Sequence, residues 1–158
     1  MNPTPLVLNT MVRRNFEIKD TDERSLKLIV AGSRTITFDA HTIGSLIRHF
    51  QLKPTEIVSG GASGIDQCAA QYARLHPYLK FMEFRADWDR HGKSAGPMRN
   101  AEMADYADAL LLIWDGSSRG SASMRAEMLK RDKPIYEVVL KLTDNTIMPI
   151  GRNAFMGR

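Results

Sequence analysis

The chain has 158 residues, of which 43% are hydrophobic and 25% charged, and its 22 Lys and Arg against 18 Asp and Glu give a net charge of +4. This length predicts one domain that buries its own core, and the composition excludes a wholly disordered chain. The sequence has no apolar run long enough for a transmembrane helix, residues 1–9 lack signal-peptide features, and Cys68 is its single cysteine. We therefore expect a cytoplasmic protein without membrane association and with Cys68 in the core. The positive charge favours anionic partners in general, and a solvated surface of mixed charge is the alternative.

The predicted elements alternate between strands and helices. Short apolar runs predict strands at 26–31, 56–59, 78–84, 109–114 and 134–139. Apolar residues at helical spacing predict helices near 43–50, 65–73, 98–106 and 122–131, with a polar loop at 85–97. This alternation predicts an α/β fold, a doubly wound parallel sheet in three layers, over residues 26–140. Residues 1–25 are read as an N-terminal extension and residues 141–158 as a C-terminal tail that is an irregular cover or a contact between chains.

Three of the strands end in small residues before a helix. Ligands of such sheets bind beyond the carboxyl ends of the strands, where helix N-termini and glycine-rich turns favour an anion. Arginine adds a forked cation that suits phosphate. We expect a phosphate at the helix starts after Gly32 and Gly61, or after Gly116; a tight turn is the alternative for each loop alone. The candidate binding residues from these strand ends are Gly32, Ser33, Arg34, Gly60, Gly61, Ala62, Gly116, Ser117, Arg119, Gly120 and Ser121.

Neither common nucleotide fingerprint is complete in the sequence. There is no Walker-type phosphate loop, and no Gly-x-Gly-x-x-Gly motif follows the first strand. The sequence therefore predicts no cofactor.

The loop 86–100 (ADWDRHGKSAGPMRN) is richer in functional groups than a simple connection needs. We expect Asp87, Trp88, Arg99 and Asn100 to line the ligand pocket, with Arg99 on a phosphate or ribose. Trp88 either stacks on a base or plugs the core. In the structural alternative, Asp87 and Arg99 pair with each other and fasten the loop.

A metal site is a weaker interpretation of the same loop. Asp87, Asp89 and His91 alternate, so an extended chain would point them to one side. Pairing of these carboxylates with arginines of the loop is the favoured interpretation, and no metal is predicted.

Four stretches resemble the SLOG superfamily, and most closely its YspA-type (cpYpsA-related) family of bacterial and phage proteins. They are VAGSR at 30–34, GGASGID at 60–66, ADWDRHGKSAGPMRNAEM at 86–103 and WDGSSRGSA at 114–122. The resemblance covers about residues 26–140. It implies a Rossmann-like sheet that binds nucleotides or nucleotide-derived ligands, and it adds Asp66 to the candidate binding residues.

A better-known branch of this superfamily, the LOG phosphoribohydrolases, releases a base from a nucleoside monophosphate. Their Arg-Lys-x-x-Met motif resembles Arg99–Met103 here, so the resemblance carries Arg99 over as a catalytic candidate beside Asp87 and Glu102. The resemblance places Met124 at the position of the catalytic glutamate of the LOG enzymes. A thioether cannot activate water or stabilise a positive charge as a carboxylate does. Asp66, Asp89 and Asp115 are further replacements for that glutamate.

The sequence leaves three functions open. The first is a binder that senses or sequesters a nucleotide-like ligand. The second is an N-glycosidase or phosphoribohydrolase, and the third is a module that binds single-stranded nucleic acid. We also expect a homo-oligomer, because four methionines could form an apolar contact surface; the alternative is that they belong to the core. These residues are Met98, Met103, Met124 and Met128.

Overall fold

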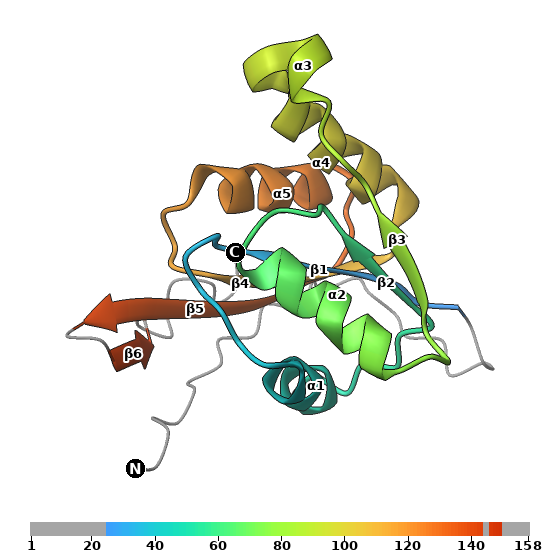
Figure 1. The fold of residues 1–158 in the computed structure, drawn as a ribbon, viewed down its shortest axis with the longest axis vertical. Helices are drawn as coiled ribbons and strands as arrows, with labels where there is room; N and C mark the ends of the chain where they lie inside the picture. Colours follow the sequence, from blue (N-terminus) through green and yellow to red (C-terminus); the bar gives the residue numbers. More distant parts are fainter. Residues whose placement is uncertain (1–24, 144–145, 150–158) are drawn as a thin grey trace.

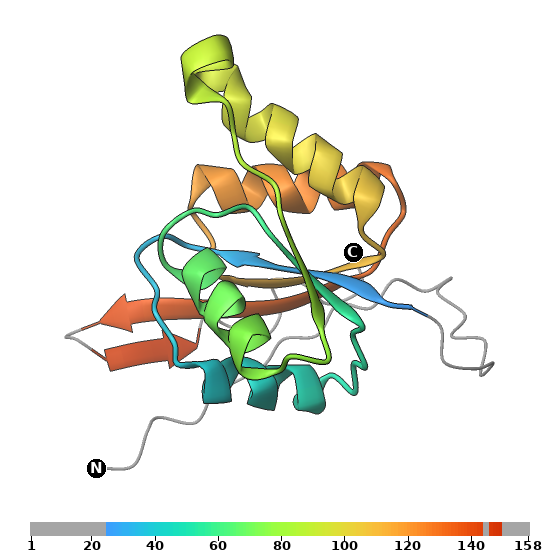
Figure 2. The same cartoon turned by 45° about the vertical axis from the view of Figure 1, so that its right-hand side comes forward.

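The computed structural model describes residues 25–143 and 146–149. Six strands form one sheet in the order β3-β2-β1-β4-β5-β6 (Figures 1 and 2). The first five run parallel, as predicted, and have the bounds Lys27–Gly32 (β1), Glu56–Ser59 (β2), Lys80–Glu83 (β3), Ala109–Trp114 (β4) and Ile135–Thr143 (β5). The predicted N-terminal extension lies almost wholly outside the described residues.

Two layers of helices cover the sheet, which confirms the three-layer architecture. Helices α1 (Ala40–His49) and α2 (Ile65–Leu75) lie on one face, and α4 (Ala95–Tyr106) and α5 (Arg119–Lys130) lie on the other (Figure 2). Side chains alternate along β1, so that Leu28 and Val30 pack with α1 and α2 while Ile29 packs with α4 and α5. Cys68 is buried in the first of these cores, as expected.

The strand order changes direction between β1 and β4. From β1 the chain continues to β2 on one side and later returns to β4 on the other. At such a point the connecting loops diverge and leave a crevice at the carboxyl ends of the strands. Gly32 ends β1 there, and a Cβ on it would lie 1.8 Å from the carbonyl oxygen of Ile113 in β4. The absence of a side chain at Gly32 is therefore required by strand packing, whatever binds above it.

The predicted loop 85–97 is largely helical. Helix α3 (Trp88–His91) and a 3-10 turn (Gly92–Ser94) lead directly into α4, which begins at Ala95. Asp87 explains this difference, because its carboxylate accepts a hydrogen bond from the N–H of Arg90 at 3.1 Å and caps α3. The segment projects from the body of the molecule (Figure 1).

Part of the predicted tail extends the sheet. Strand β5 continues past residue 140 to Thr143 and pairs antiparallel with β6 (Thr146–Pro149). The rest of the tail falls outside the described residues.

The predicted methionine surface is wrong. Met103, Met124 and Met128 are at most 2% exposed and pack between the sheet and its helices, and only Met98 of the four reaches solvent. A helix places residues three or four apart on one face, and for α4 and α5 that face is the core side. The homo-oligomer stays a prediction without this support. Within the described part of the chain, no helix has the length and apolar character that a membrane crossing demands.

Candidate functional site

A cavity of about 550 Å³ lies at the carboxyl edge of the sheet. Its walls come from the ends of β1, β2 and β4 and from the starts of α4 and α5, so the structure brings the three predicted loops together. Most of the predicted binding residues line it, namely Gly32, Ser33, Arg34, Gly60, Ala62, Asp66, Trp88, Arg99, Asn100, Arg119, Gly120 and Ser121. Their part in binding stays a prediction.

Six of the candidate residues lie elsewhere, among them Asp89, which is exposed on α3. Gly61 lines a smaller adjoining cavity of about 350 Å³, together with Arg85. Gly116 and Ser117 belong to the turn before α5 and are on neither wall. Asp87 caps α3, and Glu102 is exposed on α4, so neither of these two catalytic candidates reaches a cavity wall.

The sequence interpretation missed several wall residues. Ser118 belongs to the predicted β4–α5 loop, and its position between Ser117 and Arg119 was the available signal; Asp115 of the same loop, a candidate replacement for the catalytic glutamate, also lines the wall. Lys93, Gly96 and Pro97 reach the wall because residues 88–94 fold into helical turns. The remaining missed residues face the cavity from within elements or from a loop without a motif, and they are Ala31, Thr35, Met103, Ser123 and Met124.

The start of α5 is the most open anion site of the three predicted helix starts. Its N-cap, Ser118, makes no side-chain capping hydrogen bond, and its first turn carries no acidic residue. Ser121 in this turn is 5% exposed, and its hydroxyl has no hydrogen-bond partner in the described structure. Free N–H groups and a partial positive charge at a helix start favour an anion. A buried hydroxyl without a hydrogen-bond partner is unusual, and a bound ligand would supply that partner.

Of the other two helix starts, α1 is capped by a side chain, and α2 carries an acidic residue in its first turn. Asp39 caps α1 by accepting from the N–H of Thr42 at 2.8 Å, and seven residues separate Gly32 from this helix. The helix start after Gly32 is therefore not adjacent to that glycine, and a phosphate there stays a prediction. At α2, Asp66 accepts from the N–H of Ala62 at 3.1 Å. Asp39 and Asp66 disfavour an anion beside α1 and α2, and Asp115 holds the N–H groups of Ser117 and Ser118 just before α5. The N–H groups inside the first turn of α5 receive no side-chain cap, and the phosphate position there stays a prediction.

Arg99 joins α4 to the loop after β2. Its guanidinium donates to the carbonyl oxygen of Gly60, and its Nε donates to Oδ1 of Asn100 at 3.0 Å. The Nδ2 of Asn100 in turn donates to the carbonyl oxygen of Gly120 at 3.3 Å and to Ser123 at 3.2 Å. The two residues hold the loop after β2 and the start of α5 in fixed positions around the cavity. The predicted Asp87–Arg99 pair does not form.

Two carboxylates line the cavity, and they are in different states. Burial would raise the pKa of Asp115, but hydrogen bonds from the N–H groups of Ser117 and Ser118 lower it below its ordinary value. Asp115 is thus an ionised part of the turn. Asp66 is 6% exposed, and burial raises its pKa to about 6, although the Ala62 N–H and the charges of Arg99 and Arg34 favour the ionised form.

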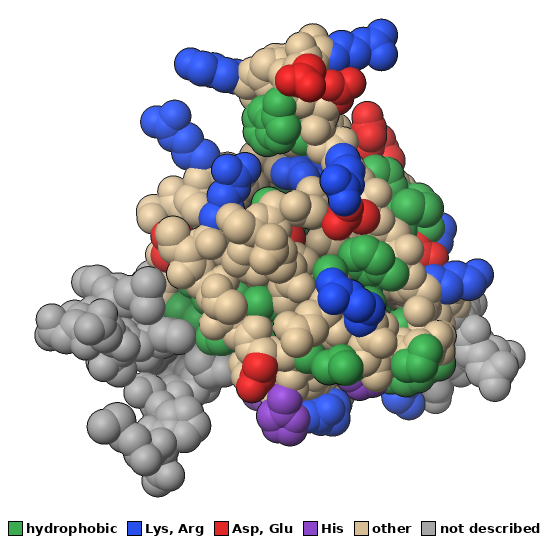
Figure 3. Space-filling view, in the orientation of Figure 1, with side chains coloured by type: hydrophobic (Ala, Val, Ile, Leu, Met, Phe, Trp, Pro, Cys, Tyr) green, Lys and Arg blue, Asp and Glu red, His purple; other side chains and the backbone are tan. Residues whose placement is uncertain are grey.

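An aromatic ring and several cations surround the cavity mouth. Trp88 is 51% exposed and lies over Gly96, so it is not a core plug. Arg34, Lys93 and Arg119 are exposed cavity residues. Figure 3 shows Lys and Arg side chains gathered over the end of the molecule from which α3 projects. An indole beside cations suits a base with an attached phosphate.

Comparison with known proteins gives one relative and one similar structure. No protein-family model matches the chain. The chain is 38% identical over 84 residues to the Gene 61 protein of Mycobacterium phage D29, a match that covers 50% of this chain and 67% of that protein. Its fold is similar to that of DNA processing protein A (DprA) from Streptococcus pneumoniae, with a TM-score of 0.59 and 19% identity over 77% of this chain.

The likeness to DprA is one of fold. The match covers 53% of the DprA chain, so this protein spans about half of it. The shared architecture confirms the Rossmann-like α/β class. The resemblance to the SLOG superfamily stays a prediction. The YspA-type and LOG relationships stay predictions.

Proposed function

The chain belongs to the family of the Gene 61 protein of Mycobacterium phage D29, and we propose that it binds a nucleotide or nucleotide-derived ligand in the cavity at the carboxyl edge of its sheet. Such a binder would sense or sequester the ligand. The observation that carries this proposal is the buried, unpartnered hydroxyl of Ser121 at the open start of α5. A phosphate oxygen would accept its hydrogen bond together with those of the first-turn N–H groups.

The rest of the cavity suits the rest of a nucleotide. Its volume of about 550 Å³ lies in the range of small-molecule sites. The exposed indole of Trp88 offers a stacking surface for a base. Arg34 and Arg119 make no hydrogen bond or ion pair within the described residues, so both guanidinium groups are available to a ligand.

Calorimetric titration with the four ribonucleoside monophosphates tests the proposal. Arg34→Ala should weaken the binding by about tenfold or more, because a charge-assisted hydrogen bond contributes about 1.5–3 kcal/mol. Arg74→Ala is the matched control, since Arg74 is an exposed arginine at the far end of α2 and lies on neither cavity wall. Equal losses in the two variants, or no binding of any nucleotide, would contradict the proposal.

Hydrolysis of an N-glycosidic bond is a second candidate function. The observation that favours it is the presence of Asp66 and Arg99 in one cavity, while Met124 forms part of the wall. Asp66 would take a proton from water, whose oxygen bonds to C1′ as the C1′–N bond breaks, and the protonated Asp66 would return this proton to the nitrogen of the departing base. Release of free base from nucleoside monophosphates, measured by chromatography, would establish this activity, and its loss in Asp66→Asn would assign it.

Binding of single-stranded nucleic acid is the remaining alternative, and the name of DprA, a DNA processing protein, is what favours it. Such binding would show a steep dependence on salt, because each phosphate contact releases counterions. A single-stranded oligonucleotide that binds much more tightly than the monophosphates would favour this alternative.

A further inference from the structure

Gly60 lies between two opposite charges on the cavity wall. A Cβ on Gly60 would be 2.6 Å from Nη1 of Arg99 and 2.9 Å from Oδ2 of Asp66. The two side chains nevertheless form no ion pair within 4.0 Å. Each is held by the loop, since Arg99 donates to the Gly60 carbonyl and Asp66 accepts from the Ala62 N–H. The structure thus holds the Arg99 guanidinium and the Asp66 carboxylate on two sides of Gly60 without direct contact between them.

The chemistry of the pair selects what can bridge it. A guanidinium only donates hydrogen bonds, and an ionised carboxylate only accepts them. A phosphate oxygen would be repelled by Asp66, and an ammonium group by Arg99. A hydroxyl accepts from one and donates to the other, so one hydroxyl oxygen satisfies both.

We propose that a sugar hydroxyl of the ligand binds between Asp66 and Arg99 beside Gly60, so that the protein selects ribonucleotides over deoxyribonucleotides. This inference rests on the proposed nucleotide binding. It adds a specificity site to the cavity, separate from the phosphate position at the start of α5. A ligand that lacks the hydroxyl would leave a buried carboxylate and a guanidinium unbridged, which weakens binding by about tenfold or more.

The charge state of Asp66 supports the site. The charged groups that face Asp66 are Arg99 from α4 and Arg34 from the segment after β1. The pKa of Asp66, raised to about 6 by burial, still leaves it mostly ionised at neutral pH, as an acceptor must be. We expect discrimination between ribose and deoxyribose to decrease as the pH falls below about 6.

Calorimetry on the full chain tests the inference with each ribonucleoside monophosphate and its 2′-deoxy and 3′-deoxy forms. One deoxy form should bind at least about tenfold more weakly than its parent. The Cβ of Gly60→Ala would lie 2.6 Å from Nη1 of Arg99 and 2.9 Å from Oδ2 of Asp66 and would displace both side chains. The variant should therefore lose more affinity for the parent than for this deoxy form. Arg74→Ala, an exposed arginine that lies on neither cavity wall, is the control and should change neither affinity.

Asp66→Asn is a second variant in case Gly60→Ala does not fold, and it should reduce the ratio of the two affinities. Equal affinities for the parent and both deoxy forms would overturn the inference and leave the proposed function intact. An equal loss for all forms in Gly60→Ala would overturn it as well, because the effect would then be one of cavity shape. If no nucleotide binds, the proposed function fails and the inference with it.

Discussion

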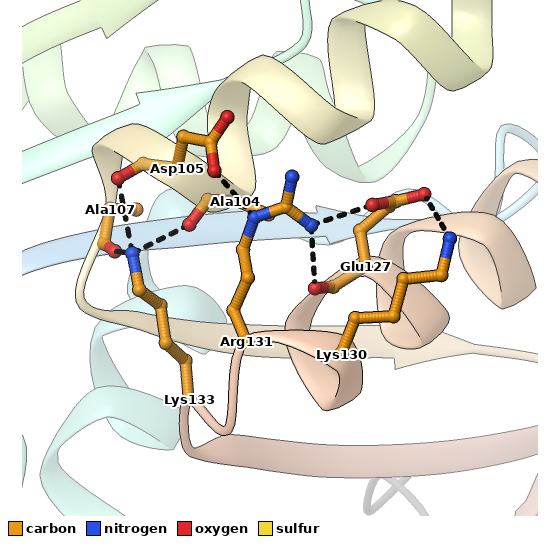
Figure 4. A network of polar contacts seen from close by, with 7 residues as sticks. All are labelled: Ala104, Asp105, Ala107, Glu127, Lys130, Arg131 and Lys133. Atoms are coloured by element: carbon orange, nitrogen blue, oxygen red, sulfur yellow. Dashed lines mark hydrogen bonds and ion pairs between the residues drawn. The ribbon is translucent and has the colours of Figure 1, made fainter.

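Helices α4 and α5 lie side by side, and their two ends are built in different ways. At the carboxyl ends lies a cluster that we call the clamp, made of Asp105, Glu127, Lys130, Arg131 and Lys133 (Figure 4). Its charged groups are all paired, and Lys133, for example, donates to three carbonyl oxygens at 2.7 to 3.1 Å. These cations also lie where the helix dipoles are negative.

The amino ends of the same helices line the cavity, and there two arginines and a buried hydroxyl are unpaired among the described residues. Arg34 and Arg119 have no hydrogen bond or ion pair with any residue that the structure describes, and the Ser121 hydroxyl has none either. The clamp satisfies its charges within the protein, whereas the cavity leaves them for a ligand. Substitutions at the clamp should therefore affect stability, and substitutions at the cavity should affect binding.

Lys133→Met should have the largest effect. It removes the cation that three backbone carbonyl groups share, so we expect the free energy of unfolding to fall by about 3 kcal/mol. Nucleotide affinity should not change. Urea unfolding measures the loss, and Lys130→Met is the control, because that side chain is 68% exposed and should contribute less than about 1 kcal/mol. Similar losses in the two variants would contradict the ranking.

Asp66→Asn should stabilise the unliganded protein. The pKa of Asp66 rises from 3.8 to about 6 on folding, so the folded chain binds more protons between these values and its stability falls as the pH rises through them. At pH 7.5 the variant, which lacks this charge, should be more stable by about 2 kcal/mol, and near pH 4 the difference should largely disappear. Urea unfolding at both pH values measures this. A less stable variant at pH 7.5 would mean that Arg99 and Arg34 already compensate the charge, and the site would not need a ligand.

Two arginines of α5 give the most direct comparison of the two ends. Arg119→Ala should lower nucleotide affinity by about tenfold, equivalent to about 1.4 kcal/mol, without changing the melting temperature. Arg131→Ala should leave the affinity unchanged and lower the stability by about 1 kcal/mol, because its ion pairs with Asp105 and Glu127 lie at the surface. Titration calorimetry and thermal unfolding of both variants measure the two effects. If Arg131→Ala weakens binding, the ends are coupled and the comparison fails.

The sequence predicted the sheet well and the long loop poorly. Buried strands such as Ala109–Trp114 are continuous apolar runs, and glycine or proline marks their ends, so their positions and parallel arrangement could be inferred. Helix α3 has four residues, too few to show an apolar period. Its signal was the cap, since Asp87 stands three residues before Arg90.

The sequence indicated where the cavity lies but not which role each of its residues has. Gly-rich strand ends indicated its edge, yet Asp87 and Asp66 look alike in a sequence, and only the fold places one at a helix cap and the other in the cavity. For Arg99, a pocket residue and a clasp were posed as alternatives. In the structure the Arg99 side chain both lines the cavity and fastens the loop at Gly60. A substitution of Arg99 would therefore change ligand binding and stability together.

The two tryptophans differ in exposure, so their intrinsic fluorescence can report on two different parts of the protein. The chain contains only Trp88 and Trp114, the first 51% exposed at the cavity mouth and the second 6% exposed with its Nε1–H donating to Glu137 at 2.7 Å. A collisional quencher in the solvent would reach the indole of Trp88 and hardly that of Trp114. The quenchable part of the emission therefore reports occupancy of the cavity, and the shielded part reports the integrity of the core.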